Sequence, residues 1–376
     1  MNHRRGAQVE ESGNSHIEVR VPLTCHRYIC RMRARLLARP VERASRSAAL
    51  HLADIPTPAV DPDDVLIRVG VCGVCRTDLD LAEGRLIAPR YPVIPGHQVV
   101  GTVTERGSAV SDVREGDRVG VAWIYSACGV CEWCRSGREN LCPYFRGTGC
   151  DANGGYAEYL SVPAAFVHAI PDELSDVAAA PLLCAGAIGW RALRLTGLRD
   201  GEPLGLTGFG ASGHLVLQLV RARFPQSNVY VFARNPAERE FASSLGASWV
   251  GDTTTRPPEP LAAIIDTTPA WKPVLAALRA LRPGGRLVIN AIRKASSDAA
   301  ELSTIDYARD LWMEREIQSV ANVTRTDVRE MLAIAASADV RPTVDEVPLE
   351  QANDALAWLG SGGAIRGARI LRVATV

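Results

Sequence analysis

The chain has almost no lysine and no excess of charge of either sign. Its 376 residues include only two lysines, Lys272 and Lys294, so nearly all of the 42 basic residues are arginines. Acidic residues also number 42, and the formal net charge at pH 7 is zero. A neutral chain carries no broad field that would attract nucleic acid or an anionic membrane surface. The composition therefore predicts neither of these partners.

The chain also has no apolar run that predicts a membrane span. The longest run, residues 177–190, falls short of the roughly 20 residues that a bilayer needs, and it contains Pro181 and Cys184. We interpret it as a domain junction. The N-terminus is polar and carries arginine rather than the apolar segment of a secretory signal. We therefore expect a cytoplasmic protein whose clustered cysteines bind metal rather than form disulfides.

The length predicts two domains. Residues 1–31 are polar and lack apolar periodicity, so we interpret them as a disordered extension, with a new start at Met32. Short runs rich in β-branched residues follow, which predict a β-rich region; they span 64–71, 99–103 and 118–122.

The pattern changes after about residue 200, where strands and helices alternate. Strands are expected at 204–207, 229–232, 262–265 and 286–289. Helices are expected at 215–222, 236–245 and 274–281. This alternation predicts a parallel sheet with helical crossovers, hence an α/β fold. A further helix is predicted at 326–338 and a last strand at 370–373.

Four cysteines lie close together at metal-ligand spacing, Cys128, Cys131, Cys134 and Cys142. Four thiolates on one loop suit a tetrahedral zinc ion, and a closed shell of this kind leaves no open position for chemistry. The spacing therefore predicts a structural zinc site. An iron–sulfur cluster is the alternative, because such clusters also use short cysteine spacings.

A glycine-rich run with the pattern G-x-G-x-x-G lies between a predicted strand and a predicted helix; it comprises Gly208, Phe209, Gly210, Ala211, Ser212 and Gly213. In this context the pattern favours a dinucleotide pyrophosphate at the helix N-terminus. The next predicted strand ends at Ala233 and Arg234 without an acid for the ribose hydroxyls. Because Arg234 can pair with a 2′-phosphate, NADP(H) is favoured over NAD(H).

Six segments occur in a characteristic order: Gly73–Asp78, Pro95–Gly101, the four-cysteine loop, Asn153–Tyr159, Pro181–Gly186 and the glycine run. From about Met32 onward the chain resembles the zinc-dependent alcohol dehydrogenases of the medium-chain dehydrogenase/reductase superfamily. The resemblance implies a GroES-like β-rich catalytic domain, residues 32–184 and 325–376, interrupted by a Rossmann domain, residues 185–324. The active site is then expected in the cleft between these domains, and the protein is expected to form a homodimer or homotetramer.

The resemblance also implies a second, catalytic zinc with an open position, held by Cys75, His97 and Cys184. It implies that Arg76 and Arg369 contact the cofactor pyrophosphate. The expected cofactors are therefore two zinc ions per chain and a nicotinamide dinucleotide.

The proton chemistry is expected near the same ligands. The resemblance implies that Thr77 bonds the substrate oxygen and passes on its proton, and that Asp78 orients the ligating histidine. Two residues depart from the family pattern. Gln98 stands where a glutamate is usual, and Asp80 stands where many relatives have a histidine that relays the proton. A carboxylate has a reference pKa of about 3.9, which suits a neutral-pH relay less well than histidine does.

Three functions fit these features. The leading one is hydride transfer between NAD(P)(H) and a primary alcohol or aldehyde, with zinc polarising the substrate oxygen. The second is reduction of a conjugated alkene or iminium on the same fold, against which Thr77 argues. The third is a zinc- and dinucleotide-binding sensor without catalysis, which the complete ligand set makes the weakest of the three.

Overall fold

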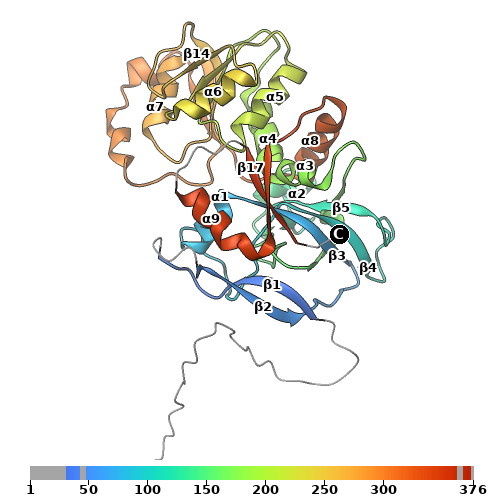
Figure 1. Cartoon of the computed structure of the whole chain (residues 1–376). Coiled ribbons are helices and arrows are strands. Elements are labelled where there is room, and N and C mark those ends of the chain that lie inside the picture. Colours follow the sequence, from blue (N-terminus) through green and yellow to red (C-terminus); the bar gives the residue numbers. More distant parts are fainter. Residues whose placement is uncertain (1–30, 43–47, 362–366, 374–376) are drawn as a thin grey trace, which may run out of the picture.

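The computed structural model describes residues 31–42, 48–361 and 367–373. Residues 1–30, which make up nearly all of the predicted extension, lie outside this range. The described chain forms two sheets at opposite ends of the molecule, with helices between them (Figure 1). This arrangement confirms the predicted α/β class with a strand-rich half and a parallel-sheet half.

The strand-rich half is a seven-stranded sheet. Its main path is β16 (Val344–Pro348), β17 (Ala368–Arg372), β3 (Asp64–Val74), β4 (Val99–Arg106), β5 (Arg118–Val121) and β9 (Val167–Ala169), with β8 (Tyr159–Pro163) also paired to β3. All pairs are antiparallel except β16 with β17. Strand β3 is mostly buried because it pairs on one side with β4 and on the other with both β17 and β8. The end of β3 leads directly into helix α1 (Arg76–Ala82).

Smaller elements complete this half. A hairpin of β1 (Arg31–Leu37) and β2 (Leu50–Pro56), which the sequence did not predict, packs beside the main sheet. The cysteine loop follows the short strand β6 (Ile124–Ser126), which pairs with β7 (Arg146–Gly147). The remaining elements are α2 (Glu132–Arg135), η2 (Glu139–Leu141), η3 (Ala164–Phe166), η7 (Leu349–Gln351) and α9 (Ala352–Gly360).

The other half is a six-stranded parallel sheet. Its order is β12 (Trp249–Gly251), β11 (Val229–Phe232), β10 (Leu204–Thr207), β13 (Leu261–Asp266), β14 (Leu281–Ile289) and β15 (Glu316–Ser319). The crossovers contain α5 (Gly213–Arg223), α6 (Pro236–Ser244), α7 (Lys272–Ala280), η5 (Ala299–Thr304) and η6 (Tyr307–Leu311). Every residue of β10, β11 and β13 is buried, as expected for strands covered on both faces.

The strand order identifies where a ligand belongs in this half. The chain runs outward from β10 to β11 and β12, then returns to the other side of β10 at β13. In open parallel sheets the ligand crevice lies beyond the carboxyl ends of the strands at such a reversal. The glycine run 208–213 follows β10 at this point, so the topology predicts a dinucleotide there.

One helical segment, Asp176–Thr196, joins the two halves. It comprises α3 (Asp176–Pro181), a π-helical turn η4 (Leu182–Gly186) and α4 (Ala187–Thr196). By length and composition this segment is apolar enough to cross a membrane, but 61% of its most apolar window is buried inside the molecule. It is therefore a core helix here, between the two halves of the molecule. The predicted boundary at residue 184 falls inside it.

The C-terminal segment is tied to this helix by one buried carboxylate. Helix α8 (Arg325–Ser337) begins after its N-cap residue Thr324. The Asp327 carboxylate accepts a hydrogen bond from the Thr324 backbone N–H. Asp327 is fully buried and accepts hydrogen bonds from Arg191 at 2.8 Å and Arg194 at 3.2 Å, both on α4. The carboxylate thus caps one helix and pairs with its neighbour.

Replacing Asp327 with alanine should therefore destabilise the protein. The change leaves Arg191, which is only 14% exposed, without its partner and removes the cap, and we expect a loss of about 3–5 kcal/mol in the free energy of unfolding measured in urea. Glu330→Ala on the same helix is the control. Glu330 is 41% exposed and pairs with Arg194, so its loss should cost less than about 1 kcal/mol. Equal effects of the two variants would contradict this assignment.

Candidate active site

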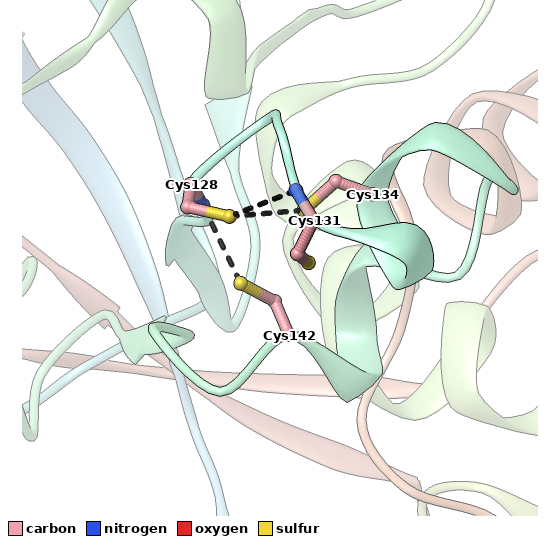
Figure 2. A group of neighbouring side chains, drawn as sticks. All are labelled: Cys128, Cys131, Cys134 and Cys142. Atoms are coloured by element: carbon pink, nitrogen blue, oxygen red, sulfur yellow. Dashed lines mark hydrogen bonds between the residues drawn. The ribbon is translucent and has the colours of Figure 1, made fainter.

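The four cysteines of the predicted structural site converge (Figure 2). Their sulfur atoms all lie within 4.8 Å of one another, and the sulfurs of Cys128 and Cys134 are 3.9 Å apart. Backbone N–H groups point at the cluster: Cys131 donates to the Cys128 sulfur at 3.4 Å, and Tyr144 donates to the Cys142 sulfur at 3.3 Å. Such donors stabilise thiolates, the form in which cysteine binds a metal.

The electrostatics of this loop favour a thiolate at Cys128 but not at Cys134, because burial raises the pKa of Cys134 to about 12. Backbone N–H groups of Val130 and Cys131 lower the pKa of Cys128 to about 6. The sulfurs surround a common centre, and Figure 2 shows all four side chains directed toward it. Four converging thiols fit a closed tetrahedral metal shell.

The second predicted ligand set also comes together, although its members are far apart in sequence. Cys75 is the N-cap of α1, His97 precedes β4, and Cys184 lies in the π-helical turn η4. Their ligand atoms lie within 4.8 Å of one another, and the two sulfurs are 3.9 Å apart. π-helical turns inside α-helices frequently occur at functional sites, and this one sets the direction of the Cys184 side chain.

A buried carboxylate orients the histidine of this cluster. Asp78 Oδ1 lies 3.2 Å from His97 Nδ1, and both side chains are almost fully buried. The same carboxylate accepts bonds from the Cys75 N–H at 2.8 Å, the Gly96 N–H at 3.3 Å and the Tyr156 hydroxyl at 3.1 Å. Asp78 therefore lies against Nδ1 of the imidazole ring, and a carboxylate beside the ring is typical of metal-binding histidines.

The remaining nitrogen of the ring tests whether a metal fits. Both ring nitrogens of His97 are buried and make no hydrogen bond among the described residues, but Nδ1 lies 3.2 Å from the Asp78 carboxylate whereas Nε2 has no such contact. Burial would lower the pKa of His97, but the nearby Asp78 and Cys75 reverse this and raise the pKa to about 10. The pKa of Cys75 is lowered well below its usual value, because Cys184 donates to its sulfur and His97 lies beside it. An unpaired nitrogen facing two thiols fits a zinc ion, which replaces the shared proton.

Thr77, which was predicted to be catalytic, and Gln98, which departs from the family pattern, lie beside this cluster. The Thr77 hydroxyl is 3.7 Å from the Cys75 sulfur. Gln98 is buried, and its side chain packs so closely on Gly73 that a Cβ there would stand 2.9 Å from the Gln98 amide carbon. On the other side, Trp123 meets the His97 ring edge-on with centroids 4.8 Å apart. The cluster is thus bounded by one hydroxyl, one neutral amide and one aromatic ring.

Asp80 has two arginine partners. Its side chain is 3% exposed, and Oδ1 accepts a bond from Arg85 at 2.6 Å. Arg293, from the loop after β14, donates to the same oxygen at 3.3 Å. The sequence suggested Asp80 as a proton acceptor, but the pairing with two guanidinium groups could not be read from it.

The glycine run forms a tight turn between β10 and α5. Gly208 has φ = +81°, and a Cβ there would stand 2.7 Å from the Thr267 hydroxyl. A Cβ on Gly213 would meet the Gly208 carbonyl at 2.8 Å, whereas Gly210 faces open space. The Ser212 hydroxyl donates to the Ala185 carbonyl at 3.0 Å, which ties the turn to η4. The N-terminus of α5 therefore opens onto free space at Gly210, as pyrophosphate binding requires.

The end of β11 carries arginine rather than acid. Ala233 is buried and Arg234 is exposed. Arg239, one turn into α6, donates to the carbonyls of both residues, at 2.6 Å and 3.0 Å. The sequence analysis missed Arg239, although its position five residues after Arg234 places it on the first turns of α6.

The two arginines expected at the pyrophosphate lie near one another. Strand pairing puts Arg369 opposite Val74, two residues before Arg76. Arg76 donates to the Leu359 carbonyl at 2.9 Å, and Arg369 stacks on Trp358 at 4.0 Å. Arg369 also pairs with Asp345 at 2.6 Å. Both arginines thus reach the same end of α9.

The described chain is similar over most of its length to known alcohol dehydrogenases. Residues 61–172 match the alcohol dehydrogenase GroES-like domain. A probable alcohol dehydrogenase, AdhA, of Mycobacterium tuberculosis is 46% identical, over 85% of this chain and 91% of that protein. A cinnamyl alcohol dehydrogenase of Sorghum bicolor has the same fold, with a TM-score of 0.76, 28% identity and coverage of 91% of this chain and 98% of that one. CAD of Helicobacter pylori, solved with NADP(H), has a TM-score of 0.80 at 24% identity, with 91% and 98% covered.

The two cysteine-containing clusters predict two metal ions per chain, and substitution should remove them one at a time. Cys142→Ser opens the four-cysteine shell, so we expect one bound zinc and a lower melting temperature, because metal binding contributes to folding. His97→Ala should also leave one zinc, and it should lower the melting temperature as well, because it removes the ring that faces the buried Asp78 carboxylate.

Elemental analysis of the purified variants measures this directly. Cys150→Ser is the control, because Cys150 is buried and belongs to neither cluster, and it should keep both ions. Loss of both ions from either single variant, or of none, would contradict two independent sites.

Proposed function

This chain belongs to the zinc-dependent alcohol dehydrogenase family of the medium-chain dehydrogenase/reductase superfamily, and from that membership we propose that it transfers hydride between NADP(H) and a primary alcohol or aldehyde. It is an oxidoreductase that acts on alcohols. The observation that carries the finer proposal is the convergence of Cys75, His97 and Cys184 around an unpaired, buried imidazole nitrogen. Three ligands with one position left open are what a catalytic zinc needs.

The chain's own residues supply binding, orientation and proton transfer. A zinc ion bound by Cys75, His97 and Cys184 supplies a Lewis acid for the substrate oxygen. Thr77 stands beside these ligands, so its Oγ1 takes the hydroxyl proton of an alcohol as its own hydroxyl proton passes to water, and the transfer runs in reverse during reduction. Asp78 holds the histidine ring in place through both directions, because its carboxylate is fixed by three hydrogen-bond donors.

Two features of the site bear on which substrate it accepts and on its net charge. Trp123 gives the cluster an apolar wall, which favours an apolar or aromatic substituent on the alcohol. Gln98 brings a neutral amide where the family pattern usually has a glutamate, so the site has one more unit of positive charge than that pattern gives. Greater positive charge near the substrate oxygen favours the alkoxide form.

Two arginines support NADP(H) as the cofactor. Arg234 and Arg239 both follow β11, the strand whose end meets the adenosine ribose in dinucleotide folds. Residues 233–235 contain no acid that would bond the ribose hydroxyls of NAD. The pyrophosphate is proposed to bind at Gly210, Ala211 and Ser212, with Arg76 and Arg369 approaching from the other half.

A panel of alcohols and aldehydes tested with both cofactors examines this proposal. We expect aldehyde-dependent oxidation of NADPH, and a KM for NADPH well below that for NADH. Arg234→Ala should raise the KM for NADPH about tenfold and change that for NADH less than about twofold, because one charge-assisted bond is lost. Arg223→Ala, exposed at the end of α5, is the control.

Other outcomes of the same panel would redirect the assignment. Turnover of conjugated alkenes or iminium compounds, with none on aldehydes, would favour the second function. One zinc per chain with no turnover at all would favour a sensor. A strong preference for NADH would overturn the role of Arg234.

We also propose that the protein works in the cytoplasm as a homodimer or a homotetramer. In either assembly, two chains pair through the edge of the parallel sheet. Strand β15 pairs with β14 on one side and has no strand partner on the other among the described residues. Large apolar side chains are exposed there: Ile317 at 44%, Trp312 at 54% and Met313 at 51%. An open, apolar strand edge favours pairing with a second copy.

Light scattering after gel filtration tests this edge. Ile317→Lys places a charge on the free strand, so we expect the mass of a single chain. Leu52→Lys on β2 is the control, since Leu52 is also exposed but lies far from β15. A single-chain mass for the unsubstituted protein would rule out the dimer.

A further inference from the structure

The structure assigns Asp80 and Arg293 as a latch that aligns the cofactor half with the substrate half, an inference that rests on the proposed function. Asp80 belongs to α1 in the strand-rich half, and Arg293 follows β14 of the parallel sheet. Arg293 Nη2 donates to Asp80 Oδ1 at 3.3 Å, and Nε lies 3.3 Å from Oδ2. The two residues are 213 positions apart, so this contact joins segments that only the folded halves bring together.

The loop that carries Arg293 is firmly fastened to the parallel sheet. The neighbouring Lys294 is 8% exposed and donates to the Asp266 carboxylate, to the Thr268 carbonyl at 2.7 Å and to the Ala270 carbonyl at 3.1 Å. Three acceptors therefore hold this ammonium group. The loop cannot shift without breaking the buried Lys294–Asp266 ion pair. The position of Arg293 is therefore fixed relative to the parallel sheet.

Further bonds hold the start of the same loop beside the glycine turn. The Asn290 backbone N–H donates to the Asp266 carbonyl at 2.7 Å, and its side chain donates to the Ser212 hydroxyl at 3.2 Å. Ser212 closes the glycine run at the N-terminus of α5. Any movement of Arg293 is thus coupled to the turn at which the pyrophosphate is proposed to bind.

Asp80 is equally well fixed on its own side. It lies three residues after Thr77 and five after Cys75, on the same short helix. Arg85, in the turn that follows α1, bonds the Asp80 carboxylate from within the same half, and the Arg85 backbone N–H bonds the Asp80 carbonyl at 2.8 Å. Arg85 therefore pairs with the carboxylate within its own half, while Arg293 connects it to the other half.

Alignment of the two halves is what hydride transfer requires. The substrate is bound beside Cys75 and Thr77 in one half, whereas the nicotinamide belongs to the other. The reacting carbon atoms must approach to about 3–3.5 Å, and a misplacement of about 1 Å can cost a hundredfold in rate. A cross-domain pair on the helix that carries both the metal ligand and the hydroxyl is well placed to set that distance.

The same contacts argue against Asp80 as the acceptor of the substrate proton. Oδ1 is shared by Arg85 and Arg293, and Oδ2 faces Arg293. A carboxylate committed to two guanidinium groups has no oxygen directed at Thr77 in the contacts observed. We therefore assign it as a positioning residue.

Four variants test the latch: Asp80→Asn, Arg293→Gln, the double variant, and Arg85→Gln as the matched control. Arg85 pairs with the same oxygen but does not cross between the halves. We expect Asp80→Asn and Arg293→Gln each to lower kcat about tenfold and to raise the deuterium isotope effect on kcat, because hydride transfer becomes the slow step. The double variant should be no worse than either single one, and Arg85→Gln should stay within about twofold of the unsubstituted enzyme.

A binding measurement separates the latch from other roles. The dissociation constant of NADPH, followed by its fluorescence without any alcohol, should change less than about twofold in all four variants. An increase for Arg293→Gln alone would mean that Arg293 binds the cofactor directly, and would overturn the latch. A changed pH profile of kcat in Asp80→Asn, with Arg293→Gln unaffected, would instead restore the proton relay.

The remaining outcomes are also decisive. Additive losses in the double variant would show that the two residues act separately. Arg293→Lys keeps the charge and should recover part of kcat, whereas a merely structural fault would appear as a lower melting temperature in every variant. Full activity of Asp80→Asn would refute the latch alone, while no turnover by the unsubstituted enzyme would refute the proposed function.

Discussion

The buried carboxylate of Asp78 is the interaction on which the site depends. It accepts hydrogen bonds from the Cys75 and Gly96 backbones and from the Tyr156 hydroxyl, and it faces His97. These partners come from the start of α1, the turn before β4 and the turn before β8, so one group draws three distant segments together. An unpaired carboxylate at this depth would be strongly destabilising, and its bonds therefore fix the backbone and the histidine ring at once.

The connecting helix supplies the other fixed point. Cys184 lies on it, Ser212 of the glycine turn bonds to it, and Asp327 ties α8 to it. The Cys75–His97–Cys184 cluster, the proposed pyrophosphate site and the C-terminal segment therefore share one support. Packing between the two sheets explains why this helix is so apolar, without any role in a membrane.

Much of this arrangement was predictable from the sequence, because its signals are local. The alternation of strands and helices after residue 204, the glycine turn and the four-cysteine loop all depend on residues close in sequence, and the predicted elements agree with the structure to within a few residues. The hairpin of β1 and β2 and the edge strand β15 were missed, since their exposed residues give no clear apolar pattern. The partners of Asp80 were also missed. Contacts across 213 residues leave no periodic signal, so Arg293 looked like any other arginine.

The scarcity of lysine has a limit that the structure explains. Arginine occupies nearly every basic position of the chain, yet a lysine stands at 294, where three acceptors surround a single buried nitrogen. A compact ammonium group can point three N–H bonds at three oxygens, whereas a planar guanidinium is too wide and presents its donors in a fork. Although the chain uses arginine at almost every other basic position, the arrangement of acceptors at the end of β13 suits the smaller ammonium group of lysine. The local arrangement of acceptors, rather than the overall preference for arginine, therefore accounts for the lysine at position 294.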